Sequence, residues 1–219
     1  MKTLLRIARN NRGFLLFLFL MFAFRSAIAD WNDVPSGSMR PTIIEGDRIV
    51  INKLAYDLHI PFTQISVVQF GDPAPGDIII FESKAAGKRL VKRVIGVPGD
   101  VVELSHNQLT INKQQLHYER LAMYSDYTLL NETLANSPHL IRTTTDKGAN
   151  NAMMANMPAV KVPPQHYLVL GDNRDNSADS RVIGFVPRDE IIGRSKTVAF
   201  SLDYDNYFLP RSDRFLHTL

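Results

Sequence analysis

Two serines flank a glycine in residues 34–42 (VPSGSMRPT), and this short segment contains the first side chains that could do chemistry. A proline near each end restricts the backbone, while the glycine between Ser36 and Ser38 permits a sharp turn. Such a loop can present a hydroxyl beside a backbone N–H, as acyl transfer requires: one oxygen attacks and nearby donors hold the oxyanion. Because Ser-Gly-Ser is also an ordinary turn sequence, the catalytic interpretation depends on finding a base.

Lysine is the base that the sequence leaves available. The six histidines lack a metal-binding spacing, no G-x-S-x-G is present, and no serine is followed three residues later by lysine. These absences argue against zinc hydrolysis, an α/β-hydrolase and an S-x-x-K enzyme. Lys92 lies in the run 90–95, where strand alternation places it on one face with Leu90 and Val94. It is therefore either a charge that protects an edge strand or a buried amine. Burial would lower its pKa, and a fall to about 8 would cost roughly 3 kcal/mol.

No metal or cofactor is expected. The chain has no cysteine, so thiolate zinc sites and cysteine nucleophiles are excluded. The acidic run 172–179 suggests a calcium loop, but an EF-hand read from Asp172 would have Arg174 at position 3, Ser177 at position 6 and Ile183 at position 12. These are the wrong residues for that loop.

The elements that must position these residues read as strands. Gly-Asp occurs five times, and short β-branched runs lie between these turn signals. We expect a mainly β, antiparallel body with strands at 47–52, 77–81, 89–97, 100–104, 109–112, 167–170 and 196–201. Residues from about 113 to 162 show few such runs, so they are interpreted as a small inserted cap region. The predicted organisation is a basic tail (1–12), an anchor (13–29), a catalytic β domain (30–104 and 163–219) and a variable insertion (105–162).

The N-terminus reads as a membrane segment. Four basic residues precede the uncharged apolar run 13–24, and Arg25 follows it. The segment fits a short single-pass membrane helix over 13–29, or a cleavable signal peptide ending in Ala27-Ile28-Ala29. A buried helix of a soluble protein is the third reading. The first 29 residues carry five positive charges, and the net charge of the remaining residues is −2. The net positive charge of the chain therefore indicates how the N-terminus is oriented in a membrane, and it does not indicate a nucleic-acid-binding body.

Four motifs, in order along the chain, resemble those of type I signal peptidases, the membrane-bound Ser/Lys proteases that remove signal peptides. Residues 35–42 resemble the nucleophile box and residues 75–81 (PGDIIIF) the buried strand box. Residues 92–100 (KRVIGVPGD) resemble the general-base box, and residues 171–187 (GDNRDNSADSR, then GFVP) the C-terminal box. The match spans residues 34 to 187, whereas residues 105–165 carry none of it.

The resemblance implies a role for each matching residue. Ser38 would be the nucleophile and Lys92 its general base, while the Ser38 N–H and the Ser36 hydroxyl would form the oxyanion hole. Ser177 would orient the lysine amine. Ion pairs would join Asp172 to Arg93 and Asp179 to Arg181. The pockets for small substrate residues at −1 and −3 would be lined by Val34, Met39, Ile43 and Val91.

The implied function is a membrane serine endopeptidase that cleaves exported pre-proteins. Its partners would be pre-proteins and the lipid bilayer, without nucleic acid. It would lie in a bacterial cytoplasmic (inner) membrane, with a cytoplasmic N-terminus and an extracytoplasmic, periplasmic catalytic domain.

The resemblance leaves open a specialised signal peptidase for a restricted substrate set such as pilins of a secretion or conjugation system. A self-cleaving repressor of the LexA type would need a helix-turn-helix domain ahead of the protease, where only 30 apolar or basic residues precede. The alternative from another class is a non-catalytic exported binding module.

Overall fold

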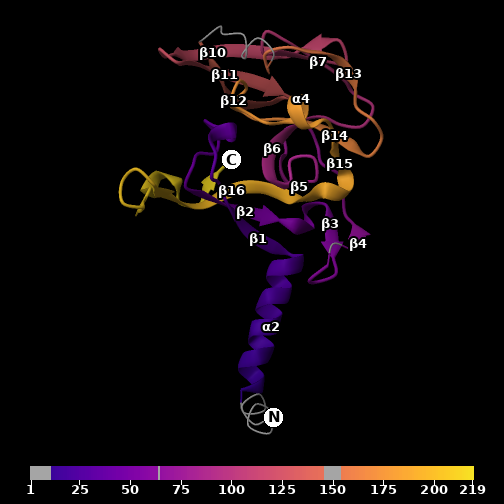
Figure 1. Ribbon diagram of the computed structural model, residues 1–219, viewed down its shortest axis with the longest axis vertical. Coiled ribbons are helices and arrows are strands. Elements are labelled where there is room, and N and C mark those ends of the chain that lie inside the picture. Colours follow the sequence, from indigo (N-terminus) through magenta and orange to yellow (C-terminus); the bar gives the residue numbers. More distant parts are fainter. Residues whose placement is uncertain (1–10, 64, 146–153) are drawn as a thin grey trace.

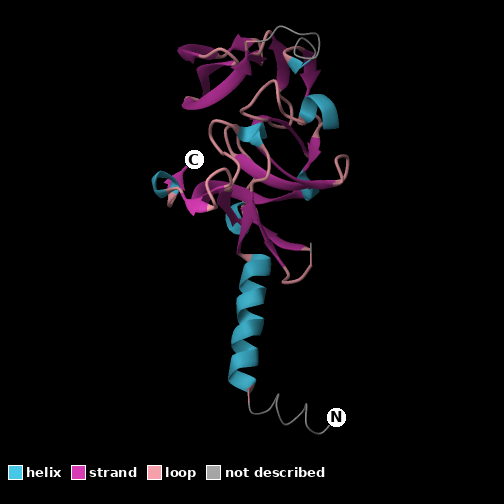
Figure 2. Cartoon of the chain, turned by 60° about the vertical axis from the view of Figure 1, so that its left-hand side comes forward, coloured by secondary structure: helices cyan, strands magenta, loops and turns pink. Residues whose placement is uncertain are grey.

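A single long helix, α2 (Arg12–Ala27), projects from a body of antiparallel strands (Figure 1). This computed structural model describes residues 11–63, 65–145 and 154–219. The predicted membrane helix over 13–29 is a helix only as far as Ala27, since Ala29 already begins the first strand. Across the described residues, no helix combines the length and the hydropathy needed to cross a membrane. The expected mainly β fold is confirmed, and in the described part of the chain the other helices are short helical turns (Figure 2).

The central sheet joins the beginning, middle and end of the chain. Its strand order is β1-β2-β16-β5-β6-β14-β15, and every pairing along it is antiparallel. The strands are β1 (Ala29–Asp33), β2 (Asp47–Asn52), β16 (Ile191–Asp203), β5 (Ile78–Ser83), β6 (Lys88–Gly96), β14 (His166–Leu170) and β15 (Val186–Pro187). The short strands β17 (Leu209–Pro210) and β18 (His217–Thr218) also pair with β16. Strand β16 thus lies between β2 and β5 and connects the two halves of the sheet.

Three smaller sheets surround this one. Strands β3 (Asp57–His59) and β4 (Ser66–Gln69) form a hairpin near the end of α2, with ring centroids of Phe19 and Phe62 6.0 Å apart. A second sheet has the order β13-β7-β8-β9, with β7 (Val101–Ser105), β8 (Gln108–Ile111), β9 (Gln114–Gln115) and β13 (Met157–Lys161). The cap sheet consists of β10 (His117–Met123), β11 (Tyr127–Leu134) and β12 (Ser137–Thr144). It lies at the end of the molecule opposite α2 (Figure 1).

Most of the predicted strands are present, and β2 has the predicted bounds. The expectation of few strands between 113 and 162 was wrong, because the whole cap sheet lies there. Its strands mix apolar and polar residues, and β10 is mostly exposed, so its sequence lacks the alternation that marks a half-buried strand. Strand β7, placed before the predicted insertion, pairs with β13 inside it.

The connecting helical turns are short. They are η1 (Gly37–Met39), η2 (Lys53–Ala55), α4 (Ser180–Ile183), η3 (Arg188–Glu190) and η4 (Ser212–Arg214). Of these, η1 carries Gly37 and Ser38 of the Ser-Gly-Ser sequence, and α4 follows the acidic run 172–179. Both sit close to the strand that carries Lys92, as described below.

Candidate active site

The amine of Lys92 and the hydroxyl of Ser38 form a direct hydrogen bond. The Nζ atom of Lys92 donates to Ser38 Oγ at 2.7 Å and to the carbonyl of Val91 at 3.0 Å. Lys92 is only 2% exposed, because its strand β6 lies between β5 and β14 inside the central sheet. The alternative that Lys92 protects an edge strand is therefore wrong.

Burial changes the acidity of this amine. Loss of hydration lowers the pKa of Lys92 from its ordinary value of 10.5 to about 8, although the negative charges of Asp179 and Asp172 oppose the change. A substantial fraction of the amine is then neutral slightly above pH 7. A neutral lysine within hydrogen-bond reach of a serine can accept its proton.

The serine loop presents further donors. Ser36 is the residue before η1, and its side chain makes no capping hydrogen bond to that turn. The side chain of Ser36 is exposed, whereas Ser38 is half-buried. Ser38 N–H forms no hydrogen bond with the residues that the structure describes. A hydroxyl and a backbone N–H are thus available beside the Ser38 oxygen.

The C-terminal box contacts both the base strand and the serine loop. Arg93 donates to the two carboxylate oxygens of Asp172 at 2.8 and 2.7 Å. Asp172 also accepts from the Thr42 hydroxyl at 2.5 Å. Burial works against the charge of Asp172, but the pKa of this carboxyl is still lowered, chiefly by Arg93. One carboxylate therefore links β6 to the segment that follows η1.

A second ion pair lies within the C-terminal box itself. Arg181 donates to Asp179 at 2.8 and 2.7 Å, and Asp179 accepts from Gly171 N–H at 3.0 Å. Gly171 is required by close approach: a Cβ atom there would lie 2.4 Å from the Ser38 carbonyl oxygen and 2.3 Å from Ser177 Oγ. The absence of a side chain lets the serine loop lie directly against this segment.

The remaining predicted residues are placed as follows. Ser177 Oγ is buried near Gly171, and it has no hydrogen-bond partner within the described residues, Lys92 included. The predicted pocket residues Val34, Met39 and Ile43 belong to one buried cluster, against which the partly buried Val91 packs. These three side chains are at most 4% exposed, so they form the packed wall behind the serine loop.

Several contacts near the site were not anticipated. Asn173 donates to both carbonyls of the Gly37–Ser38 segment, and Thr42 bonds to Asp172. In the cap sheet, Glu132 accepts from Arg174 at 2.8 and 2.5 Å and from the Tyr118 hydroxyl at 2.6 Å. Burial opposes the charge of Glu132, but Arg174 holds the pKa of this carboxyl below its ordinary value. Asn173 and Arg174 lie in the C-terminal box over residues 171–187, whereas Glu132 lies where the sequence shows no pattern.

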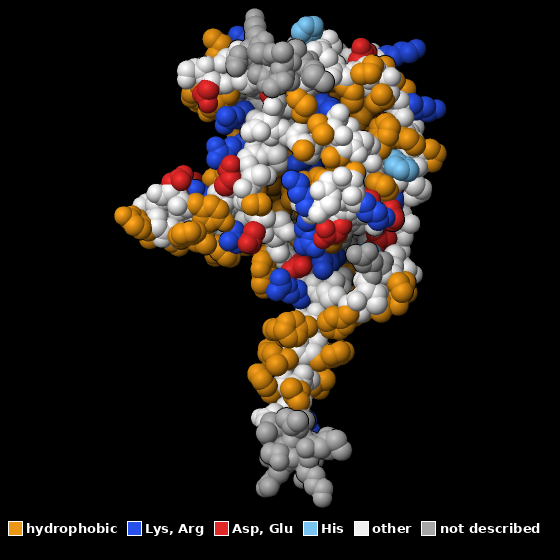
Figure 3. All heavy atoms as spheres, in the orientation of Figure 1, with side chains coloured by type: hydrophobic (Ala, Val, Ile, Leu, Met, Phe, Trp, Pro, Cys, Tyr) orange, Lys and Arg blue, Asp and Glu red, His pale blue; other side chains and the backbone are white. Residues whose placement is uncertain are grey.

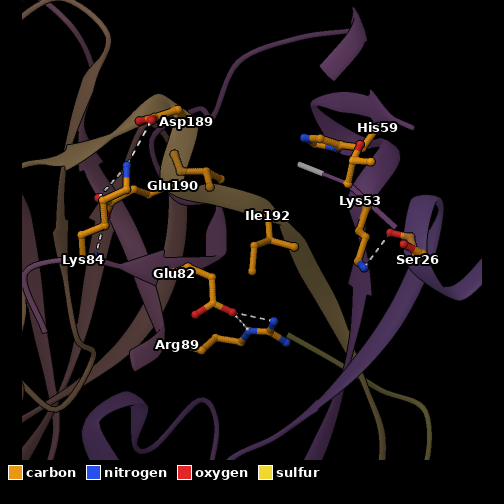
Figure 4. Close-up of a pocket in the computed structure, with 11 residues that line it drawn as sticks. Ser26, Lys53, His59, Glu82, Lys84, Arg89, Asp189, Glu190 and Ile192 are labelled. Atoms are coloured by element: carbon orange, nitrogen blue, oxygen red, sulfur yellow. Dashed lines mark hydrogen bonds and ion pairs between the residues drawn. The ribbon is translucent and has the colours of Figure 1, made fainter. Parts of the chain in front are cut away.

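A hollow lies away from this site, at the junction of α2, β5, β6 and the start of β16. It has a volume of about 480 Å³ and is lined by charged side chains that pair with one another (Figure 4). Arg89 donates to Glu82 at 2.8 and 2.6 Å, Lys84 lies 3.3 Å from Asp189, and Lys53 donates to the carbonyl of Ser26 at 2.9 Å. This hollow is distinct from the Ser38 site. Within the described ranges, no three His, Asp or Glu side chains gather as a metal site requires.

Known proteins resemble this chain over most of its length. The model of the family described as "Signal peptidase, peptidase S26" matches residues 7–200. Signal peptidase I of Pseudomonas aeruginosa is 32% identical, covering 89% of this chain and 73% of its own. Signal peptidase I of Pseudomonas fluorescens is 34% identical with the same coverage. A crystal structure of a signal peptidase I from Enterococcus faecalis has 33% identity and a TM-score of 0.38, covering 57% of this chain and 97% of that one.

Proposed function

Because this chain belongs to the signal peptidase family, peptidase S26, and is a peptidase, we propose that it cleaves signal peptides from exported pre-proteins with Ser38 as nucleophile and Lys92 as general base. The observation that carries the proposal is the 2.7 Å hydrogen bond between Lys92 Nζ and Ser38 Oγ. A buried amine with a pKa near 8 supports the assignment, since such an amine is partly neutral at the pH of the cell exterior.

The proposed reaction has two stages. Ser38 Oγ attacks the scissile carbonyl while its proton passes to Lys92, and the oxyanion that forms is held by the Ser38 N–H and the Ser36 hydroxyl. Lys92 then protonates the leaving amine, which leaves an acyl-enzyme ester on Ser38. In the second stage a water gives a proton to Lys92 and attacks the ester. Lys92 returns this proton to Ser38 Oγ as the ester bond breaks, and the signal peptide leaves as a carboxylic acid that loses its remaining proton to solvent.

Specificity for small substrate residues at −1 and −3 is part of the proposal. Val34, Met39, Ile43 and Val91 form an apolar wall beside Ser38. Because this wall is already filled by its own side chains, space beside it suits a methyl group better than a large side chain. Such packing also keeps water away from Lys92, so one feature supports both selectivity and the lowered pKa of the amine.

We further propose that the chain is anchored in the bacterial inner membrane by α2, as a single pass with a cytoplasmic N-terminus and a periplasmic catalytic domain. Most side chains of the helix are apolar and exposed (Figure 3), among them Phe14 and Phe17, each of which is 60% exposed. Its 16 residues rise about 24 Å, so the hydrocarbon would be thinned or the flanks would reach the interface. At the body end, Arg25 lies 4.2 Å from the centroid of the Trp31 ring, a pair suited to the headgroup region.

The structure around Ala27-Ile28-Ala29 favours an N-terminal segment that is retained as an anchor instead of one that is cleaved as a signal peptide. Ala27 ends α2 and is 5% exposed, while Ala29 pairs with Asn52 in the β1–β2 ladder. A protease needs its target in an extended, accessible form, and this segment is folded. Cleavage there would first require β1 to separate from β2. The mass of the mature N-terminus would decide between the two, and we expect the full chain.

The dyad is tested by cleavage of a purified pre-protein in detergent micelles. We expect Ser38→Ala and Lys92→Met to lower kcat/KM by about a thousandfold or more. Lys88→Met is the matched control, because Lys88 lies on the same strand but is exposed, and it should cleave at close to the wild-type rate. Wild-type activity in either dyad variant would exclude the mechanism.

Anchoring is tested separately by fractionating cells that express the full chain. Phe17→Asp should shift protein from the membrane fraction, because a carboxylate in hydrocarbon is costly. Leu121→Asp, on the exposed face of β10 far from α2, should leave the distribution unchanged. Equal distributions for both variants would argue against α2 as the anchor.

A further inference from the structure

Asn173 holds the peptide group that carries the Ser38 N–H. Its side-chain Nδ2 donates to the carbonyl oxygen of Gly37 at 2.9 Å, and its backbone N–H donates to the carbonyl oxygen of Ser38 at 3.1 Å. Asn173 is 5% exposed, so both bonds are shielded from water. Two consecutive carbonyls of the nucleophile turn are therefore fixed by one residue.

The planar peptide group explains how the bond from Asn173 Nδ2 to the Gly37 carbonyl affects the Ser38 N–H. Gly37 C=O and Ser38 N–H belong to one planar unit and point in opposite directions when the peptide is trans. A donor that fixes the carbonyl therefore also fixes the direction of the N–H. Glycine offers little resistance to rotation of this unit, because it has no Cβ to restrict φ and ψ. Besides Asn173, the described residue that donates to the Gly37 carbonyl is Arg40, through its N–H at 3.1 Å.

We propose that Asn173 is a positioning residue for the oxyanion hole: it holds the Gly37–Ser38 peptide so that the Ser38 N–H points at the developing negative charge. The inference rests on the proposed function, in which Ser38 N–H is one of the oxyanion donors. Asn173 itself touches no reacting atom. Its contribution is made through the direction of the Ser38 N–H, which it fixes together with the Arg40 N–H that also holds the Gly37 carbonyl.

The cap sheet holds Asn173 in place in turn. Arg142, on β12, donates its N–H to the carbonyl of Asp172 at 2.8 Å and accepts from Arg174 N–H at 2.9 Å. Asn173 thus sits between two backbone hydrogen bonds to one residue of β12, in the manner of a parallel bridge. This gives a function to a region that shares no motif with the catalytic boxes: the cap braces the segment that orients the oxyanion donor.

The test removes the side-chain bond and keeps the backbone bond. Asn173→Leu is neutral and of similar size, and Asn173→Asp keeps the shape but turns the donor into an acceptor. Asn176→Asp is the charge-matched control, since Asn176 lies in the same segment and is exposed. Both Asn173 variants should lose about 10- to 100-fold in kcat, because one oxyanion donor is misdirected rather than deleted. KM should change by less than about threefold, because substrate binding does not use this donor.

A second measurement distinguishes a misdirected Ser38 N–H from a general disruption of the site. A peptide aldehyde adds Ser38 Oγ to its carbonyl carbon, and its oxygen then occupies the oxyanion position as the hydroxyl proton moves to Lys92. The affinity of Asn173→Leu for this aldehyde should fall in step with kcat/KM, whereas its affinity for a non-cleavable peptide with proline after the scissile position should stay unchanged. The midpoint of the pH–rate profile should also stay where it is in wild type. Equal losses for both ligands, or a shifted midpoint, would overturn the proposal.

The two proposals fail in different ways. Retained activity in Ser38→Ala would remove the proposed function and this inference together. An inactive Ser38→Ala enzyme alongside wild-type kcat in Asn173→Leu would overturn the oxyanion inference alone. Wild-type kcat/KM in Asn176→Asp is expected in either case, and a loss there equal to that of Asn173→Asp would assign the effect to charge and overturn the inference.

Discussion

The Oγ atom of Ser38 lies 2.7 Å from the Nζ atom of Lys92, although 54 positions separate the two residues in the chain. Their elements are not neighbours in the sheet: η1 precedes β2, and Lys92 lies on β6, with β16 and β5 between those two strands. The contact is made because the loop that contains η1 folds back toward β6. There it packs against the segment that begins at Gly171, through hydrogen bonds that involve Thr42, Gly37 and Ser38. The proximity thus depends on a third part of the chain.

The first prediction concerns the pH dependence of cleavage. Lys92, the proposed base, can accept a proton only when its amine is neutral, and burial lowers its pKa to about 8. The rate should therefore rise about tenfold per pH unit below 8 and level off above it, so that at pH 6 about 1% of the plateau remains. Steady-state kcat/KM measured from pH 5.5 to 10 checks this. A profile that is flat from pH 6 to 9 would exclude lysine as the base.

The second prediction is that the buried Lys92 amine lowers the free energy of unfolding of the chain at neutral pH. The pKa of Lys92 is lower in the folded chain than in the unfolded one, from 10.5 to about 8, so the unfolded state binds more protons between these values. Stability should increase as the pH rises from 8 to 10.5, and below 8 the full penalty of about 3 kcal/mol applies. Lys92→Met should therefore raise the free energy of unfolding by roughly that amount at pH 7, and by less at pH 10.

Urea unfolding at several pH values measures this difference, and Lys88→Met serves as the exposed control. The informative quantity is the change in free energy of unfolding between pH 7 and pH 10. A gain from Lys92→Met that is constant across this range would contradict a buried, titrating amine. So would a similar pH-dependent gain in the control.

The third prediction compares two ion pairs. Asp172→Asn leaves the Arg93 guanidinium buried without its charge partner, which should lower the free energy of unfolding by about 3 to 5 kcal/mol. Asp189→Asn breaks an exposed pair with Lys84, in which both side chains are more than 70% exposed, and should cost less than about 0.5 kcal/mol. Chemical denaturation at pH 7 compares them directly. Equal decreases in the free energy of unfolding would show that burial does not determine how much the Asp172–Arg93 pair contributes to stability.

The fourth prediction concerns Gly171. A Cβ atom there would lie 2.4 Å from the Ser38 carbonyl oxygen, so Gly171→Ala should push the serine loop away from its support. We expect kcat to fall about 100-fold, because misplacement by about 1 Å is enough for such a loss. Gly71→Ala is the control, since its Cβ would meet only the Ala55 carbonyl oxygen at 3.8 Å. Comparable rates for the two alanine variants would show that the close approach at Gly171 is dispensable.

Residue patterns predicted the local parts of this structure well. Strand β2 is a β-branched run bounded by turn residues, so nearest neighbours along the chain determine it. The cap sheet was missed because its strands, such as β10, carry scattered polar residues on exposed faces. The burial of Lys92 could not be decided from residues 90–95, because it depends on β14, which pairs with β6 from more than 70 positions further along. The bonds from Asn173 to the serine turn are equally non-local.

Strand β16 joins two parts of the sheet that are both synthesised before it. Residues 34–52 carry Ser38 and residues 78–96 carry Lys92, yet β2 and β5 pair with β16 and not with each other. During synthesis both catalytic groups emerge long before Ile191–Asp203 does. Because β16 lies between β2 and β5, the two halves of the sheet share no edge until that strand is in place. We therefore expect the contact between Ser38 and Lys92 to form only after residues 191–203 have joined the sheet.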